Sequence, residues 1–338
     1  MDNPVNKPIE DGDALGADVQ IPESVRPTGL DKYVGQTNVV EIVKLKINAA
    51  LRRREPLGHM LFTGPYGVGK TALAGIIANI LEEKFGGDFV CISGKEITNK
   101  AQVHELLLDL NRMSVIFCDE LHGLAPGIQD LLHKPLEEFK LDIITERKVH
   151  TETLVPFIFI GATTNENKIT APLLSRLYQL NFEHYTKEDL STIIRNSAQI
   201  LNIPIDNDAA LEIARRSQDT PRTANLLLLW ARDFAEERAQ GQVTLEVVQS
   251  ALAMLRIDNM GINEIGTKYM HILLNKPKGM PVGVNNLAGS LSTNKATLEE
   301  RIEPFLKRRG FVEVVTGGRR ATEDGYAYYD VELPRERR

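Results

Sequence analysis

The chain has 338 residues, of which 42% are hydrophobic and 25% are charged, and its formal net charge at pH 7 is -6. This length and composition predict a globular protein with enough chain for two or three packed domains. The negative net charge excludes a general cationic coat for nucleic acid, so any such contact needs a local basic patch. No run approaches the roughly 18 consecutive apolar residues of a membrane span. We therefore expect a cytoplasmic protein that does not contact a membrane.

Residues 1–23 form an acidic stretch without the basic start and apolar centre of a signal peptide, and we expect this tail to be disordered. The two cysteines, Cys91 and Cys118, each lie inside an apolar run. A small apolar side chain suits a buried strand there, so packing is favoured over a metal site or a disulfide. Their small number fits a reducing cytosol.

Residues 24–184 alternate helical patterns, at 39–54 and 71–85, with short apolar runs. The apolar runs are 59–64, 88–94, 113–120 and 155–164. Each run is apolar on both faces, as the strands of a covered parallel sheet must be. This order predicts an α/β nucleotide-binding core built on a parallel sheet.

Beyond this core the strand signals stop. Residues 185–258 carry four helical stretches and predict a small helical lid domain. Residues 259–338 read as a helix, a loop rich in glycine and proline, two more helices and two short strands around Gly317 and Gly318. Three helices and a terminal hairpin predict a winged-helix domain.

A phosphate loop lies between the first apolar run and the following helix. Residues 64–71 read GPYGVGKT and match the G-x-x-x-x-G-K-[ST] pattern. Glycines let backbone N–H groups close around phosphates, Lys70 reaches the outer phosphates, and the Thr71 hydroxyl can ligate magnesium. The predicted nucleotide contacts of this segment are Gly64, Gly67, Val68, Gly69, Lys70, Thr71 and Ala72.

Two carboxylates follow the third apolar run directly, Asp119 and Glu120. Parallel strands bring them to the edge of the sheet that carries the phosphate loop. We predict that Asp119 holds magnesium through water and that Glu120 orients and deprotonates the attacking water. His122, two residues on, is either a switch that senses the nucleotide or a bystander.

The fourth apolar run ends in Thr163, Thr164 and Asn165. These side chains can hydrogen-bond the terminal phosphate or its water, and we assign Thr164 to the catalytic set. A turn-forming polar cluster is the alternative for each of the three.

Two arginines are candidates for contacts with the triphosphate. Arg176 lies at the edge of a predicted short helix and cannot easily reach the phosphates bound by its own chain. We therefore interpret it as an arginine finger that contacts the triphosphate of a neighbouring subunit. The alternative is a surface salt bridge. Arg222 begins a lid helix, where arginine is disfavoured by the helix dipole, and is predicted to report the nucleotide state to the lid. Arg26, Tyr33 and Tyr185 are candidates for the adenine, or ordinary packing residues.

A local basic patch lies near the C-terminus. Arg319 and Arg320, with Lys307, Arg308 and Arg309 upstream, suit phosphate contacts without base readout. For 307–309 the alternative is a basic helix end that complements its own macrodipole, and the sequence does not decide between the two.

Over residues 24–328 these motifs resemble the AAA+ ATPases, and most closely the RuvB-type Holliday-junction branch-migration motors. The strings that carry the resemblance are RPTGLDKYVGQ, GPYGVGKTALAGIIAN, FCDELHGL, LEEFKLDI, PFIFIGATT, TAPLLSRL, DTPRTANLLL and RDFA in the first two domains, and PVGVNNLAGSLS, EPFLKRRGF and GRRAT in the third. The last group is the more specific, since the others fit many AAA+ proteins.

The resemblance implies a hexameric ring around double-stranded or branched DNA, with ATP and Mg²⁺ at subunit interfaces and the winged helix on the duplex. It assigns phosphate and magnesium binding to Lys70 and Thr71, and hydrolysis to Asp119 and Glu120. Arg176 becomes the finger in trans and Arg222 the lid sensor. Further family nucleotide contacts fall at Arg26, Tyr185 and 137–139.

Three departures from the family pattern stand out. The segment 144–157 is short and polar where the family has an apolar hairpin that docks RuvA, which leaves open a RuvA-like partner, a different loader or a self-sufficient mode. In the wing, Val314 replaces a usual arginine, whereas Arg319 is kept and Arg320 is gained. SRLYQL, which contains Arg176, replaces an SRFG-like string, so the glycine that usually follows the aromatic residue of the finger motif is missing. A clamp-loader-like remodelling ATPase and a nucleotide-gated scaffold remain as alternative functions.

Overall fold

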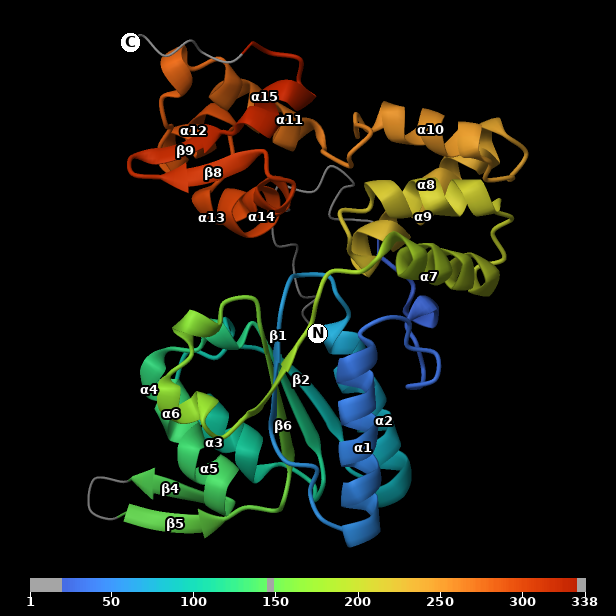
Figure 1. Ribbon diagram of the computed structural model, residues 1–338. Coiled ribbons are helices and arrows are strands. Elements are labelled where there is room, and N and C mark those ends of the chain that lie inside the picture. Colours follow the sequence, from blue (N-terminus) through green and yellow to red (C-terminus); the bar gives the residue numbers. More distant parts are fainter. Residues whose placement is uncertain (1–19, 145–148, 333–338) are drawn as a thin grey trace, which may run out of the picture. The chain divides into compact units, whose positions relative to one another are not determined.

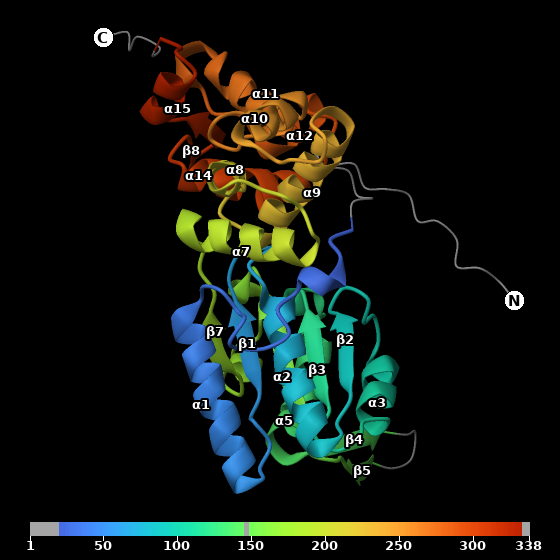
Figure 2. The same cartoon turned by 90° about the vertical axis from the view of Figure 1, so that its right-hand side faces the viewer.

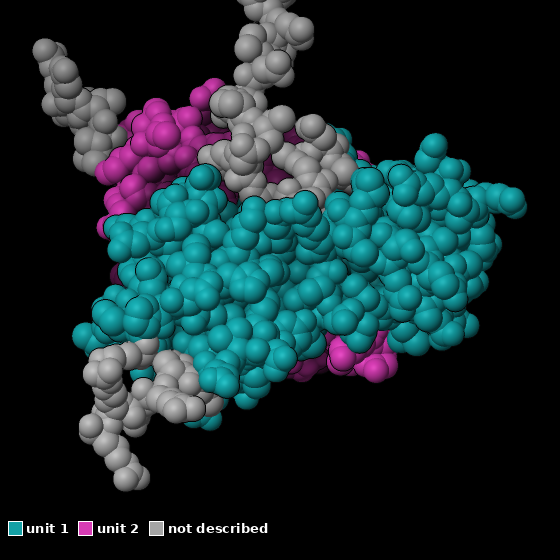
Figure 3. Space-filling view, turned by 90° about the horizontal axis from the view of Figure 1, so that it is seen from above, with its two compact units in different colours: residues 1–22, 194–219, 223–338 teal, residues 23–193, 220–222 magenta. Residues whose placement is uncertain are grey.

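The computed structural model describes residues 20–144 and 149–332, so most of the predicted 1–23 tail lies outside the described residues. The chain divides into two compact units, which are described separately below. Unit 2 comprises residues 23–193 and 220–222, and unit 1 comprises the rest of the chain. Figure 3 colours the two units. No described helix has the length and apolar character needed to cross a membrane.

Unit 2 contains a five-stranded parallel sheet in the order β2-β3-β6-β1-β7. Figure 2 shows β7, β1, β3 and β2 across this sheet, and Figure 1 labels β6. The strands are β1 (Met60–Thr63), β2 (Phe89–Ser93), β3 (Val115–Asp119), β6 (Ile158–Thr163) and β7 (Tyr178–Asn181). All four predicted strands are present, and the α/β prediction is confirmed. β7 was not predicted, because its residues YQLN are mostly polar and only Leu180 is buried.

Helices cover both faces of this sheet (Figure 1). One face carries α1 (Thr37–Arg53) and α2 (Lys70–Phe85). An apolar core that includes Leu61, Ile116 and Leu136 lies between the other face and a layer of short helices. These helices are α3 (Lys100–Leu108), α4 (Pro126–Gln129), α5 (His133–Glu138) and α6 (Ala171–Leu174), with 3-10 turns η2 (Leu121–Gly123), η3 (Asp130–Leu132) and η4 (Glu166–Lys168). A further 3-10 turn, η1 (Glu23–Val25), precedes α1.

One buried-strand expectation is wrong. β2 is an edge strand with no fully buried residue, and Cys91 on it is exposed, whereas Cys118 on β3 is buried as predicted. An apolar run does not distinguish an edge strand from a central one, because both pack at least one face against helices.

The polar segment after α5 forms an antiparallel hairpin of β4 (Lys140–Ile144) and β5 (Val149–Thr153), and residues 145–148 between them lie outside the described part. Its described side chains make local polar contacts. Asp142 accepts hydrogen bonds from Lys134 at 2.6 Å and from Thr151 at 2.6 Å, and these two bonds hold the pKa of Asp142 below its usual value.

Most of unit 1 is helical. The predicted lid corresponds to α7 (Lys187–Ile200), whose first turns belong to unit 2, and to α8 (Asn207–Arg216), α9 (Pro221–Arg238) and α10 (Leu245–Met254). Local sequence explains the helix starts. Thr244 accepts a hydrogen bond from the Val247 N–H as an N-cap, and Pro221 occupies the first turn of α9.

The C-terminal part of unit 1 has the predicted winged-helix elements. Its helices are α11 (Glu264–Leu274), η5 (Pro277–Gly279), α12 (Val284–Ser290), α13 (Lys295–Thr297), the π-helical η6 (Leu298–Ile302), α14 (Glu303–Arg308) and α15 (Glu323–Tyr328). The hairpin of β8 (Val312–Val315) and β9 (Gly318–Ala321) turns at Gly317 and Gly318 as expected. Tyr269, Leu287 and Leu298 are fully buried in a core of their own. The winged-helix prediction is confirmed, with α15 as an addition.

Candidate nucleotide-binding and hydrolytic site

The phosphate loop connects the end of β1 to the start of α2. Gly64, Gly67 and Gly69 have φ angles of 134°, 77° and 95°. A Cβ on Gly64 would lie 2.4 Å from the Phe182 carbonyl oxygen, and one on Gly69 would lie 2.5 Å from the Tyr33 hydroxyl. The loop therefore needs glycine at both positions for steric and conformational reasons.

Two buried tyrosines hold the back of the loop. Tyr33 donates to the Gly69 carbonyl at 3.0 Å, and Tyr185 donates to the Val68 carbonyl at 3.2 Å. In a trans peptide the C=O and N–H point in opposite directions, so the N–H groups of Gly69 and Lys70 face away from the tyrosines. Burial raises the pKa of Tyr185 to about 12 and that of Tyr33 well above its usual value, which keeps both hydroxyls protonated as donors.

The three residues that the sequence proposed as adenine contacts, Arg26, Tyr33 and Tyr185, have different surroundings in the structure. Tyr33 and Tyr185 contact the loop backbone, and the ring of Tyr185 packs on Gly35, where an added Cβ would lie 2.6 Å from a ring carbon. Arg26 is exposed and forms an ion pair with Glu23 at 3.6 Å. The structure thus brings the two tyrosines to the phosphate loop, while Arg26 contacts its own short helix.

Lys70 folds back over the loop. Its ammonium donates to the carbonyls of Gly64 at 2.8 Å and Pro65 at 2.6 Å, and its side chain is buried. Burial lowers the pKa of Lys70 to about 8, and the charge of Asp119 opposes that shift. Thr71 and Ala72 follow in the first turn of α2 and are half-buried.

The two predicted hydrolytic carboxylates lie at the end of β3 and differ in their contacts. Asp119 accepts the Glu120 N–H at 2.8 Å, and Glu120 has a left-handed φ of 48°. The carboxylate of Glu120 pairs with the Lys95 ammonium at 3.1 Å. Lys95 follows β2 and was not predicted, because a lone lysine after a strand carries no sequence signal.

The three polar residues at the end of β6 and directly after it differ in exposure. Thr163 is buried, accepts the Asn165 N–H at 3.0 Å and lies 3.0 Å from the His122 ring nitrogen Nδ1. Thr164 is exposed. His122 therefore contacts the end of β6 through Thr163.

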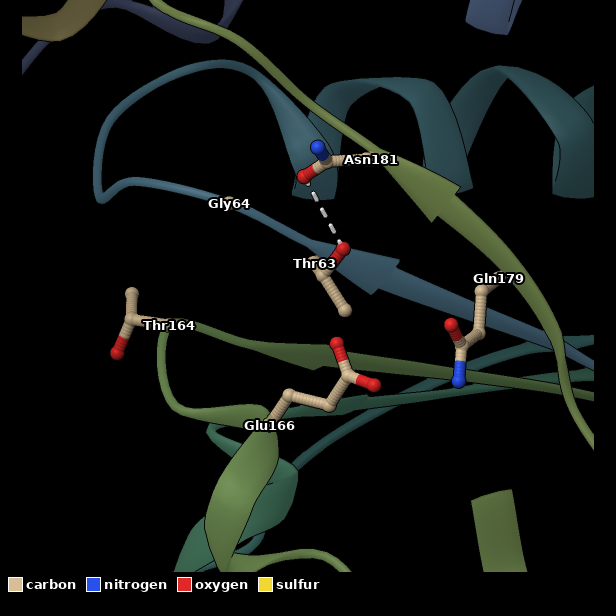
Figure 4. A pocket seen from close by; sticks show the side chains of 6 residues that line it. All are labelled: Thr63, Gly64, Thr164, Glu166, Gln179 and Asn181. Carbon is tan, nitrogen blue, oxygen red and sulfur yellow. Dashed lines mark hydrogen bonds between the residues drawn. The ribbon is translucent and has the colours of Figure 1, made fainter. Parts of the chain in front are cut away.

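Thr164 lines a pocket at the ends of β1, β6 and β7 (Figure 4). The other lining residues are Thr63, Gly64, Glu166, Gln179 and Asn181. The Thr63 hydroxyl donates to the Asn181 side-chain oxygen at 3.3 Å. Gln179 and Asn181 were missed because β7 was missed.

The two predicted arginines have different surroundings. The backbone N–H of Arg222 donates to the Gly67 carbonyl at 3.3 Å, and its guanidinium lies 5.3 Å from the centre of the exposed Tyr66 ring. Arg176 instead pairs with Glu137 at 2.6 Å and donates to the Pro172 carbonyl at 2.7 Å. Arg222 is therefore at the phosphate loop, and Arg176 is bound to neighbouring elements of its own chain.

All three predicted DNA contacts have carboxylate partners within unit 1. Arg319 is 12% exposed and bridges Glu299 at 2.6 Å and the buried Glu303 at 2.8 Å. Arg309 is 22% exposed and lies 3.2 Å from Asp219. Arg320 pairs with Glu313 at 2.6 Å and keeps 49% of its side chain exposed. Of the three, Arg320 is the most accessible to a phosphate.

Comparison with known proteins covers nearly the whole chain. The Holliday junction DNA helicase RuvB P-loop domain matches residues 25–181, the RuvB AAA lid domain matches 185–258, and the RuvB C-terminal winged helix domain matches 259–330.

Individual relatives agree with these matches. The Holliday junction branch migration complex subunit RuvB of Myxococcus xanthus is 40% identical over 327 residues, which are 95% of this chain and 94% of that protein. The subunit of the same name from Flavobacterium johnsoniae is 40% identical over 316 residues, 92% of each chain. The solved Thermotoga maritima RuvB Holliday junction branch migration motor has a TM-score of 0.82 and 33% identity, covering 92% of this chain and 100% of that one. The chain belongs to the RuvB family of AAA+ P-loop ATPases.

Proposed function

We propose that this protein is an ATP-driven motor that promotes branch migration of Holliday or other branched DNA junctions. The proposal rests on the phosphate loop, where the charge of Asp119 acts on Lys70 and the Arg222 N–H donates to the Gly67 carbonyl, in a chain that matches RuvB through all three domains. We assign these domains to residues 24–184, 185–258 and 259–338.

In this proposal ATP binds with Mg²⁺ at the phosphate loop. The N–H groups on the side away from Tyr33 and Tyr185 hold the phosphates, and Lys70 exchanges its two carbonyl partners for phosphate oxygens. Mg²⁺ is commonly held by one or two carboxylates together with substrate phosphates, and Asp119 and Thr71 supply a matching donor set. Glu120 acts as the base for the attacking water, and Thr164 positions the terminal phosphate.

We further propose assembly as a ring, with six copies as in the family. Each Arg176 then serves the nucleotide of its neighbour, which requires it to leave Glu137 or to carry Glu137 with it into the interface. Support comes from its position, since the residues that hold Arg176 do not belong to the phosphate loop.

For DNA, we propose that the β8–β9 wing contacts the duplex backbone mainly through Arg320, with Arg319 and Arg309 occupied by intramolecular pairs. The relatives are named as subunits of a complex. If a RuvA-like partner docks on β4–β5, that partner needs a polar surface, because the described hairpin side chains include Lys140, Asp142, His150 and Glu152.

ATP turnover and strand movement on a synthetic four-way junction test the proposal. We expect junction DNA to stimulate turnover by the wild-type chain and junction arms to migrate only with hydrolysable ATP. Glu120→Gln is the matched control, which should bind ATP and DNA but neither turn over nor migrate. If neither duplex nor branched DNA changed the ATP turnover of the folded protein, the proposed motor function would be refuted.

The polar β4–β5 hairpin favours one alternative, a remodelling ATPase that acts on another protein through this hairpin. Turnover that responds to a protein client and not to DNA would support that alternative.

A further inference from the structure

The basic run 307–309, which the sequence left undecided, lies in a defined contact within unit 1. Arg308 pairs with Asp219 at 3.0 Å and donates to the Gln218 carbonyl at 3.1 Å. Arg309 pairs with the same carboxylate at 3.2 Å. We call Asp219, Arg308 and Arg309 the Asp219 clamp. It joins the end of α14, in the winged-helix domain, to the loop that precedes α9.

The clamp is partly shielded from solvent and holds a stretch of backbone with left-handed φ angles. The side chains of Asp219, Arg308 and Arg309 are 15%, 29% and 22% exposed. Gln218 and Asp219 have consecutive left-handed φ angles of 55° and 61°. Such angles cost free energy in residues other than glycine, so the contacts around them must maintain the loop. The Gln218 side chain adds a further contact by donating to the Gly261 carbonyl at 2.9 Å.

The loop leads directly to the nucleotide site. Asp219 is the last residue of unit 1 before residues 220–222, which belong to unit 2. Arg222, three residues beyond Asp219, contacts Gly67 of the phosphate loop through its backbone. Only two residues, Thr220 and Pro221, therefore separate Asp219 from the residue that contacts Gly67.

We propose that Asp219, Arg308 and Arg309 are positioning residues that fix the start of α9 so that Arg222 is held ready for the triphosphate. Two arginines of the winged-helix domain thereby influence nucleotide affinity without touching the nucleotide. Without the clamp, nucleotide binding must itself order the loop, and that entropy cost lowers affinity. The role of Arg222 rests on the proposed function, but the clamp makes a prediction that does not involve DNA.

Calorimetric titration of the full chain with a non-hydrolysable ATP analogue, without DNA, tests the clamp. We expect the double variant Arg308→Ala, Arg309→Ala to weaken binding by about fivefold or more, and Asp219→Asn to do the same. Asparagine keeps the size of aspartate and tolerates left-handed φ, so it removes charge with little change in backbone preference. The double replacement by lysine should restore part of the affinity, because it keeps both positive charges.

Lys268→Ala is the matched control, because Lys268 is a basic residue of the same domain that pairs with Glu264 outside the clamp, and it should leave analogue affinity unchanged. Unchanged affinity in folded Asp219→Asn and in the double alanine variant would overturn the proposal. So would a double alanine variant that binds the analogue normally but loses DNA affinity, which would make the arginines DNA contacts. If DNA did not change the ATP turnover of the wild-type chain, the proposed motor function would be refuted. The comparison of analogue affinity between the wild type and the clamp variants would still be valid.

Discussion

At the residue scale, the hydrolytic base has an unexpected partner. Lys95 places its ammonium 3.1 Å from the Glu120 carboxylate, and its stem lies over Gly123, where an added Cβ would approach the lysine Cγ to 2.7 Å. Both charges are partly exposed, so the pair is worth at most about 1 kcal/mol. We propose that this pair competes with the attacking water for the Glu120 carboxylate.

Replacing Lys95 by methionine keeps the stem and removes the charge. We expect turnover without DNA to rise about two- to fivefold, because 1 kcal/mol corresponds to roughly a fivefold change in an equilibrium. Steady-state ATP hydrolysis measures the change. Lys44→Met, which breaks the exposed Lys44–Glu41 pair on α1, is the control and should have no effect. A fall in turnover toward that of Glu120→Gln would mean that Lys95 assists the base.

The lowered pKa of Lys70 gives nucleotide binding a dependence on pH. Its pKa is about 8 in the free protein because of burial. Phosphate oxygens favour the protonated amine and raise that pKa, so ATP binding takes up protons near and above pH 8, and affinity falls as the pH rises beyond 8.

Calorimetry at pH 8 in two buffers of different ionisation enthalpy should reveal uptake of about half a proton per ATP. Lys70→Arg is the matched variant, because arginine remains charged throughout this range and its binding should show no such uptake. Equal binding enthalpies for the wild type in both buffers would contradict the assignment.

At the scale of elements, the sequence predicted what periodicity and glycine patterns encode. The four apolar runs, the lid helices and the β8–β9 turn at Gly317 are all present, since each depends on local pattern. What the sequence could not supply was long-range pairing. β7 is polar and became a strand only by pairing with β1, and Lys95 met Glu120 only because β2 and β3 are neighbours.

The wing shows the same limit, because two adjacent arginines look equivalent in sequence and differ in the structure. Arg319 neutralises Glu303, which has no exposed surface and also accepts a hydrogen bond from the Tyr269 hydroxyl. Lys307 bonds the other Glu303 oxygen at 2.6 Å. Burial raises the pKa of Tyr269, so it stays protonated as a donor. Arg320 pairs at the surface with Glu313.

Arg319→Ala should therefore lower the free energy of unfolding by about 3 kcal/mol or more, because it leaves a buried carboxylate short of a partner. Arg320→Ala should change it by less than about 1 kcal/mol, and should weaken duplex DNA binding with a smaller salt dependence. Urea unfolding measures the stability of each variant, and DNA titration at two salt concentrations measures its DNA affinity. Together they distinguish the structural role of Arg319 from the DNA-binding role of Arg320. Equal destabilisation by both variants would show that Glu303 is satisfied without Arg319.

At the scale of the whole molecule, the proposed ring makes each nucleotide site depend on two copies. Glu120 and the phosphate loop come from one copy and Arg176 from the next. Such a head-to-tail interface is heterologous, so the residues that one copy donates differ from those that it receives. The carboxylate that holds Arg176 within its own chain, Glu137, then marks the face that turns toward the neighbour.

Mixing two inactive variants tests this arrangement. Glu120→Gln cannot hydrolyse its own ATP but still donates Arg176, whereas Arg176→Ala lacks the finger but keeps its base. In a random 1:1 mixture, about a quarter of the interfaces combine an intact base with an intact finger, so turnover should recover to about that share of the wild-type rate. A chain carrying both substitutions, mixed with either single variant, is the control and should remain inactive. If Arg176 served its own nucleotide, each site would lack one group in every mixture, and no recovery would occur.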